Sequence, residues 1–453
     1  MDQAHTSQGG LLRILGFGFG IAVVIGSTLG LGILAAPGTV AQSLGNVWWA
    51  LGVWTLVSIY TLFGTVIAAE LATMLPRAGG WYVYARRAFG EASGFTFGWT
   101  NWLMLAATNA TLAVAVGEFI GELWPAAENH VRLIAVLTLA GFAVLQWFGT
   151  RLSSQTQQVT SFIKALAFII LVAACFIVGN DAPSSFDLPT LPSAPATFAA
   201  LVAGLITSLQ IVIFAFDGWY GALYFAEEDT DPGRNLPRAM ISGTLLIIAI
   251  YFLVNFAIFY VLPLDQVAGA EVAAAEAAKV IFGAYGETII LIISLIAVLS
   301  VMNAVLLQTT RVLFGISRDK LVTQRLSSVN TVGTPTSSLI LCTLASIGLV
   351  LLAEAILNKL VAITSYFFVV IYLSGFIAMW VLRRKEADLP RPFRAWLHPW
   401  STLFVIIVSL LFLAGALYSD TENSVYALVL IALSFPAYFL LKRAHVLPDG
   451  DKQ

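Results

Sequence analysis

Two ionisable side chains lie inside otherwise apolar stretches, and their chemistry would allow them to bind a charged ligand. Asp217 interrupts the stretch 188–226, and Lys164 interrupts the stretch 152–180. A charged side chain at mid-span costs about 3 kcal/mol, so each must face a polar environment. Asp217 can cap a half-helix or act as a functional carboxylate, and both roles require a broken helix. Lys164 can extend to the interface along its stem or be fixed between two helices, and we favour the second.

The first apolar stretch carries three glycines within seven residues, at positions 26, 30 and 32. Each glycine weakens a helix by about 1 kcal/mol relative to alanine, and backbone groups freed inside a membrane need a cavity or protein partners. Close packing on a neighbouring helix explains the glycines as well as a break does. A second break is indicated at Asp217-Gly218, because this dipeptide favours a turn.

The two interrupted stretches occupy corresponding places in the two halves of the chain, as the first and sixth spans. Such a pair is the best sequence indication of a secondary transporter built from inverted five-helix repeats. The N-terminus of a half-helix presents free N–H groups that suit a carboxylate. Its C-terminus presents carbonyl groups that suit an ammonium. A site with both ends is suited to the main-chain part of a free amino acid.

Composition sets the context for these breaks. Charged residues make up 11% of the 453 residues, against about 25% in soluble domains. Long unbroken apolar runs exclude a β-barrel and predict an all-α integral membrane protein of one domain. Its twelve transmembrane helices would span residues 14–37, 47–75, 93–123, 131–149, 155–178, 198–227, 238–262, 280–316, 336–353, 358–384, 398–418 and 423–443. Residues 14–178 form the first repeat, 198–384 the second, and 398–443 helices 11 and 12.

Basic residues predict the orientation, because cytoplasmic loops are rich in Lys and Arg. With the N-terminus inside, 19 of the 23 Lys and Arg residues fall on one side, from Arg13 to Lys452. Only Arg132, Lys279 and Lys359 fall on the other, and Lys164 lies within a span. We therefore expect a multi-pass protein of the cytoplasmic membrane with both termini in the cytoplasm.

Other kinds of chemistry are poorly supported by the sequence. The four histidines are scattered and the two cysteines lie in separate apolar spans, so we expect no metal site, no cofactor and no catalytic residues. The chain is therefore not expected to be an enzyme. The net charge of −2 and the lack of a basic patch beside aromatic residues argue against a nucleic-acid partner.

Several segments, in order along the chain, are similar to the amino acid–polyamine–organocation superfamily, and most similar to its L-type amino acid exchangers and their bacterial relatives. They are Gly26–Ile33 with Pro37-Gly38; Glu70–Gly80 with Tyr82 and Tyr84; Phe214–Trp219 with Glu227-Glu228 and Pro232–Pro237; Tyr251–Asn255; Arg311 with Arg318-Asp319; and Leu382–Arg384 with Asp388–Pro392. The resemblance covers nearly the whole chain. It implies the leucine-transporter-like fold, with helices 1 and 6 broken.

The resemblance also implies roles for particular residues. Backbone around Thr28, Gly30, Leu31 and Gly32 would bind the substrate carboxylate. Carbonyls of Phe214, Ala215 and Asp217 would take the amino group, with Phe214 as a gate and Trp219 lining the site. Lys164 would replace a sodium site and work with Tyr251, while Glu70 and Arg77 would serve the cytoplasmic gate or local ion pairing.

The chain departs from the family pattern at three places. Leu31 stands where many relatives have Ser or Ala, which removes a hydroxyl and narrows the pocket. Asp217 replaces a common Gly and adds a negative charge that could admit a further cation or a proton. Residues 123–130 contain no Cys, so we expect no disulfide-linked heavy chain.

The sequence thus predicts secondary active transport of free L-amino acids by alternating access, and neutral amino acids are the favoured substrates. Transport would be sodium-independent exchange or coupled to protons. Asp217 leaves a polyamine or other organic cation as an alternative substrate, and a channel is disfavoured because no ring of charges or repeated carbonyl loop is evident. Asn109, Asn303 and Phe367 are candidates for side-chain specificity, although each could equally serve helix packing.

Overall fold

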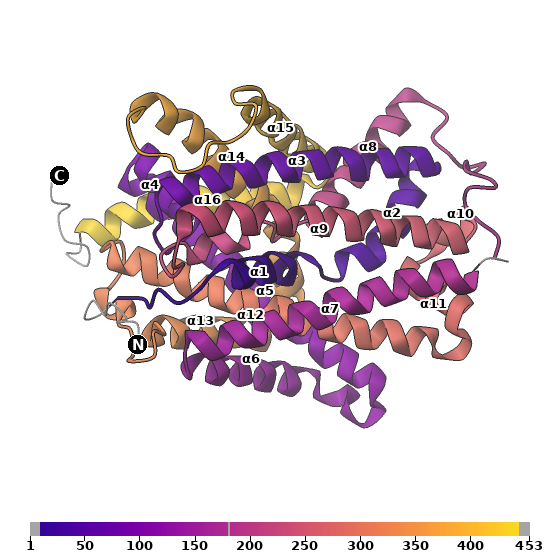
Figure 1. Ribbon diagram of the computed structural model, residues 1–453, viewed down its shortest axis with the longest axis horizontal. Coiled ribbons are helices and arrows are strands. Elements are labelled where there is room, and N and C mark those ends of the chain that lie inside the picture. Colours follow the sequence, from indigo (N-terminus) through magenta and orange to yellow (C-terminus); the bar gives the residue numbers. More distant parts are fainter. Residues whose placement is uncertain (1–9, 180–181, 353, 444–453) are drawn as a thin grey trace.

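The chain is almost wholly helical. The computed structural model describes residues 10–179, 182–352 and 354–443, and these contain isolated bridges at Leu15–Asp229 and Asn46–Thr190 but no strand. Long helices run side by side along the longest axis of the molecule (Figure 1). The predicted all-α class is confirmed.

The helices follow one another with short connections. They are α1 Phe17–Thr28, α2 Gly32–Leu44, α3 Val47–Met74, α4 Trp81–Phe89, α5 Glu91–Leu123, α6 Val131–Trp147, α7 Thr150–Val178, α8 Phe198–Ala215, α9 Pro232–Val261, α10 Leu264–Gly269, α11 Ala273–Phe282, α12 Gly286–Arg318, α13 Thr336–Leu351, α14 Glu354–Lys385, α15 Trp400–Ser419 and α16 Thr421–Arg443. Short 3₁₀ helices add η1 Pro125–His130, η3 Gly221–Phe225, η4 Gly283–Tyr285 and η5 Gln324–Ser327.

Most of these helices can cross a membrane. Ten spans in the described residues are long and apolar enough, and the bent pair α1 and α2 makes an eleventh. α13 is apolar but has only 16 residues, fewer than the roughly 20 that a straight span needs. The count of twelve therefore stays a prediction, and so do the two inverted repeats.

The first span is broken, as the glycines suggested. α1 ends at Thr28, α2 begins at Gly32, and the two axes differ by 44°. The expected end of this span at Pro37 is wrong, because α2 continues to Leu44. Pro37 is tolerated inside this helix because neighbouring segments of the protein pack around it. A Cβ on Gly38 would lie 2.5 Å from the Ala270 carbonyl oxygen, so the helix packs tightly against the segment that follows α10.

The sixth span is also broken, but its second half is not the expected α-helix to residue 227. α8 ends at Ala215, turns follow, and η3 is a 3₁₀ segment. Gly218 has φ +102°, and a Cβ there would lie 2.6 Å from the backbone of Ser27. A Cβ on Gly32 would likewise lie 2.8 Å from the Ala215 Cα. The two breaks therefore touch each other, and glycine is needed at both contacts.

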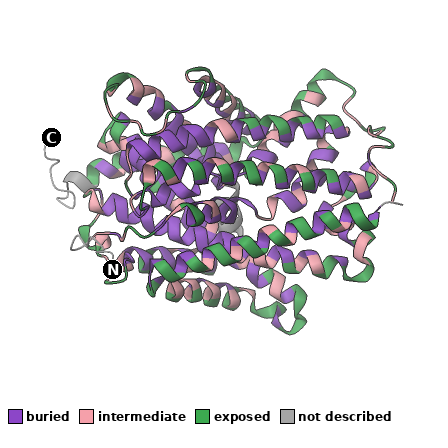
Figure 2. Cartoon of the chain, viewed as in Figure 1, coloured by how far each residue is buried: buried purple, intermediate pink, exposed green. Residues whose placement is uncertain are grey.

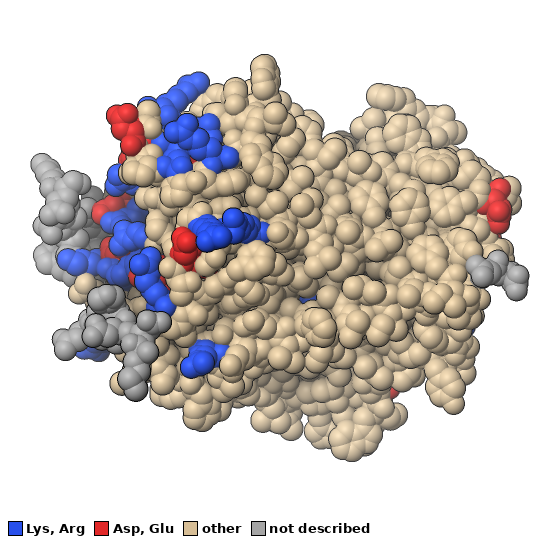
Figure 3. Space-filling model, viewed as in Figure 1, with Lys and Arg blue, Asp and Glu red and all other residues tan. Residues whose placement is uncertain are grey.

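Burial and charge agree with a membrane setting. In α3, 67% of the apolar window is buried, against 17% in η1–α6, so α3 is central and α6 is peripheral. Figure 2 shows exposed residues along the outer helices. On the face shown in Figure 3, Lys and Arg gather at one end, which we call the basic end, beside a broad uncharged band. Lys452 lies outside the described residues, and the assignment of the basic end to the cytoplasm stays a prediction.

Candidate functional site

A cavity of about 280 Å³, here called the central cavity, lies where the two breaks meet. Its walls come from both breaks and from α5, α12 and α14. Seven of the eight residues predicted to bind substrate line it, namely Thr28, Gly30, Leu31, Gly32, Phe214, Ala215 and Asp217. Among the 16 lining residues Asp217 is the only ionisable one. The structure thus brings these residues together, and their binding of a substrate remains a prediction.

Unpaired hydrogen-bond donors collect at the break in the first span. The N–H groups of residues 30–33 have no acceptor among the described residues, because the first hydrogen bonds of α2 run from Leu34 and Ala35 to the Leu31 oxygen. The Thr28 hydroxyl is buried there without a partner. Such donors at a helix N-terminus form a site suited to an anion.

Tyr251 of α9 joins the C-terminal ends of both broken helices. Its hydroxyl oxygen lies 2.8 Å from the Thr28 carbonyl oxygen and 2.7 Å from the Ala215 carbonyl oxygen. The side chain is buried between Trp54 and Phe216, with ring centroids 5.6 and 4.7 Å away. Since a hydroxyl has one hydrogen, the two carbonyls share one donor. Tyr251 therefore fixes α1 and α8 relative to each other beside the cavity.

Lys164 lies in the middle of α7 and is fully buried. Its ammonium nitrogen donates to the Gly26 carbonyl oxygen over 2.8 Å, in the last turn of α1. α7 begins at Thr150 rather than near residue 155, so Lys164 is about 21 Å into the helix at 1.5 Å per residue. The alternative that the Lys164 side chain extends to the membrane interface is therefore wrong. A cation at a helix C-terminus stabilises the exposed carbonyls of that end.

Asp217 does not act as the simple helix cap considered above. One carboxylate oxygen, Oδ1, accepts hydrogen bonds from the hydroxyls of Tyr372 and, over 3.2 Å, of Tyr220. Tyr372 belongs to α14, so this contact links the sixth-span break to a helix on the far side of the cavity. No basic side chain forms an ion pair with Asp217 in the described part of the chain. The carboxylate is thus held by neutral donors.

Trp219 does not line the central cavity, contrary to the expectation. It is 1% exposed and packs edge-on against Trp81, Tyr220 and Tyr372, with centroids 5.3–6.0 Å apart. The turn at Gly218 carries the chain away from the cavity before Trp219 is reached. Trp81, Trp219, Tyr220 and Tyr372 thus form an aromatic layer next to Asp217, here called the aromatic floor.

Phe214 has the position expected of a gate. Its side chain is 49% exposed and its ring centroid lies 6.1 Å from that of Phe368. It lines the central cavity and also a second cavity of about 320 Å³ that reaches Ser419 and Asp420, between α15 and α16. Phe214 is thus a wall residue of both cavities, and its role as a gate stays a prediction.

Sequence reasoning missed part of the cavity wall. Thr108 and Thr111 of α5 line it, and their hydroxyls bond back to the carbonyls of Met104 and Ala107, both over 3.0 Å. The signal was a pair of threonines three residues apart on one face of an apolar span. Of the candidates named for specificity, Asn109 instead donates to Thr309.

The other two specificity candidates also lie outside the cavity wall. Asn303 donates to the Gln157 side-chain oxygen over 2.7 Å, between α12 and α7. Phe367 is buried among core residues. Neither residue is among those that line the central cavity, so both serve helix packing in this structure.

Glu70 and Arg77 lie among ion pairs at the basic end. Glu70 is fully buried and binds Arg383 and the backbone N–H of Ala395. Arg77 lies 3.3 Å from Asp319, which also accepts from Tyr82. Burial, followed by the charge of Asp319, raises the pKa of Tyr82 well above its usual value, so this hydroxyl stays a donor. Both residues thus make local ion pairs, and a role in gating is not thereby tested.

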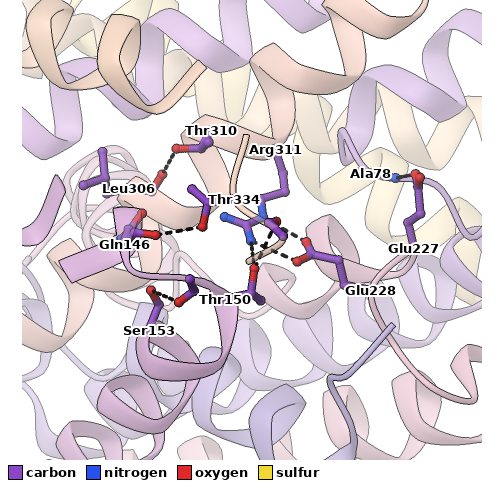
Figure 4. Close-up of polar contacts among 12 residues, drawn as sticks. Ala78, Gln146, Thr150, Ser153, Glu227, Glu228, Leu306, Thr310, Arg311 and Thr334 are labelled. Carbon is purple, nitrogen blue, oxygen red and sulfur yellow. Dashed lines mark hydrogen bonds and ion pairs between the residues drawn. The ribbon is translucent and has the colours of Figure 1, made fainter. Parts of the chain in front are cut away.

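Another ion pair at the basic end, between Arg311 and Glu228, is buried. Arg311 of α12 donates to both Glu228 oxygens over 2.8 and 2.9 Å, and to Thr150 over 3.4 Å (Figure 4). The exposed fractions of the two charged side chains are 1% and 0%. The Glu228 carbonyl also accepts from Leu15 N–H, ahead of α1. This pair therefore ties α12 and α7 to the segments that flank both broken spans.

Comparison with known proteins identifies the family of the chain. The family model described as amino acid permease matches residues 18–435. The chain therefore belongs to the amino acid permease family, whose members are transporters rather than enzymes.

Individual relatives align over nearly the whole chain. The serine/threonine exchanger SteT of Bacillus subtilis is 26% identical, over 97% of this chain and 99% of the relative. The mouse large neutral amino acids transporter small subunit 2 is 27% identical, over 97% and 83%. The human cystine/glutamate transporter is 24% identical, over 93% and 83%. The predicted superfamily is thereby confirmed.

Proposed function

We propose that this chain transports free L-amino acids across the cytoplasmic membrane by alternating access, as a sodium-independent exchanger or with coupling to protons. The observation that carries the proposal is the group of unpaired donors at residues 30–33, with the Thr28 hydroxyl, beside a cavity of about 280 Å³. These donors suit the carboxylate of an amino acid. The relatives named as exchangers or transporters of amino acids support this substrate class over polyamines.

Lys164 supports independence from sodium. A bound cation could stabilise the carbonyl end of α1, and the Lys164 ammonium already contacts the Gly26 oxygen there. Tyr251 would keep the ends of α1 and α8 in register while the substrate binds between them. Access would alternate between a path past Phe214 and a path through the aromatic floor and the basic-end ion pairs.

The basic end would face the cytoplasm, because cytoplasmic loops are rich in Lys and Arg. Both termini would then be cytoplasmic. The chain would need the lipid bilayer and its substrate as partners, and no disulfide-linked heavy chain. Both described cysteines, Cys175 and Cys342, are buried free thiols, which supports the last point.

A competition panel tests the substrate class. Purified protein in proteoliposomes takes up labelled leucine or alanine at pH 5.5 and 7.5, in sodium-free buffer, against each proteinogenic amino acid and putrescine. We expect a subset of amino acids to compete and putrescine not to compete. Folded protein that takes up none of the proteinogenic set would refute the proposal. A higher rate at pH 5.5, with the inside neutral, would favour proton coupling over pure exchange.

A further inference from the structure

We propose that the Asp217 carboxylate binds the ammonium group of the substrate, together with carbonyl groups of the α1 and α8 breaks. The inference rests on the proposed function and adds an ionic contact to it. It also defines a ligand class, since an organic ammonium ion without a carboxylate should bind to the same cavity.

The first step concerns the carbonyl groups that would share the ammonium with Asp217. Those of Thr28 and Ala215 both lie within hydrogen-bond distance of the Tyr251 hydroxyl, at 2.8 and 2.7 Å. The Phe214 carbonyl accepts the N–H of Asp217 over 3.0 Å. The Gly26 carbonyl already binds the Lys164 ammonium. Each of these carbonyl groups thus already has one contact within the protein and has one further lone pair at most for a substrate.

The second step concerns the charge of Asp217. The other 15 residues that line the central cavity carry no charge. The groups that contact the carboxylate are the hydroxyls of Tyr220 and Tyr372, which are neutral donors. The Lys164 ammonium contacts the Gly26 carbonyl oxygen, and Lys164 is not among the residues that line the cavity. A carboxylate in such an apolar region is costly without a cation, so a cation that enters the cavity is attracted to it.

The third step concerns the geometry of the two ends of the substrate. Residues 30–32, whose N–H groups are free, and Asp217 line the same cavity, on two breaks that touch through Gly32 and Ala215. The cavity thus holds both a donor site and an acceptor site. An α-amino acid places its carboxylate and ammonium two bonds apart and can reach both.

The test uses thermal unfolding of the detergent-purified full chain with three probes. These are leucine, 3-methylbutylamine, which has the ammonium alone, and 4-methylpentanoate, which has the carboxylate alone. A ligand that binds the native state raises the unfolding temperature, and the rise grows with the logarithm of its concentration above Kd. We expect the amine to stabilise the wild type, and Asp217→Asn to need a roughly tenfold higher amine concentration or more. Stabilisation by the acid should persist in this variant.

Matched variants separate charge from structure. Asp265→Asn changes an exposed carboxylate outside the cavity and should retain amine binding. If Asp217→Asn does not fold, Asp217→Ser replaces it. Equal amine concentrations for the wild type and the Asp217 variant, or an equal loss in Asp265→Asn, would overturn the inference. If the wild type takes up no amino acid, the proposed function is refuted. The measurement of amine binding does not depend on transport, so the two failures can be told apart.

Discussion

The ammonium nitrogen of Lys164 lies 2.8 Å from the carbonyl oxygen of Gly26, two residues before the end of α1. This contact places a fixed positive charge at the carbonyl end of the broken first span, where the partial charge of the helix is negative. The ammonium is therefore in direct contact with the broken first span. The account of this protein as a sodium-independent transporter depends on that contact, and the predictions below test it and the other contacts at the breaks.

Replacement of Lys164 by Ala should reduce amino acid uptake roughly tenfold or more, because a hydrogen bond to a charged group contributes about 1.5–3 kcal/mol. Expression and the elution profile of the purified protein should survive. Lys279→Ala serves as the control, since Lys279 lies at the exposed surface. Unchanged uptake with unchanged pH dependence would mean that Lys164 is only structural.

Tyr251→Phe removes one hydroxyl that contacts the carbonyls of Thr28 and Ala215. Each carbonyl then lacks this donor in a buried place, at a cost of about 1–3 kcal/mol. We expect a lower uptake rate and a lower unfolding temperature. Tyr285→Phe is the control, because that side chain is 75% exposed. A Tyr251→Phe protein with wild-type stability and rate would show that the hydroxyl does not fix the two helix ends.

Gly218→Ala should destabilise the fold by about 2–3 kcal/mol or more, because φ +102° disfavours alanine and its Cβ would meet the Ser27 backbone at 2.6 Å. Thermal unfolding in detergent measures the effect. Gly141→Ala, where a Cβ meets nothing within 4 Å, should be neutral or slightly stabilising. Equal stabilities for the two variants would argue against close contact between the breaks.

Removal of one partner of the buried Arg311–Glu228 pair should cost about 3–5 kcal/mol, because the other charge remains in the protein interior. Arg311→Met and Glu228→Gln should each lower the unfolding temperature markedly. The double variant Arg311→Met, Glu228→Gln should recover part of the loss, and the exposed Arg325→Met should have little effect. Additive losses in the double variant would contradict the assignment of a coupled pair.

Much of the fold followed from the sequence, because the patterns are local. Charge-free runs located most helices to within a few residues, and Gly30 and Gly32 marked a break that the structure contains. The second half of the sixth span could not be predicted in this way. Its 3₁₀ form and the position of Trp219 depend on contact between Gly218 and Ser27, which are 191 residues apart in the chain.

The residues of the central cavity could likewise be predicted only in part from the sequence. Asp217 and Lys164 stood out because charge is rare in the spans. Thr108 and Thr111 did not, since threonines are common there and only the packing of α5 shows which ones reach the cavity. The partners of Asp217 were equally hidden, because Tyr372 lies on α14, 155 residues away.

The most direct test of the central claim is exchange in sodium-free proteoliposomes. Uptake of a labelled amino acid from the panel is measured with and without unlabelled amino acid inside, for the wild type and for Lys164→Ala. The account predicts that internal amino acid accelerates uptake by the wild type without sodium, and that Lys164→Ala loses this uptake. Uptake that requires sodium, or that is equally fast in Lys164→Ala, would contradict it.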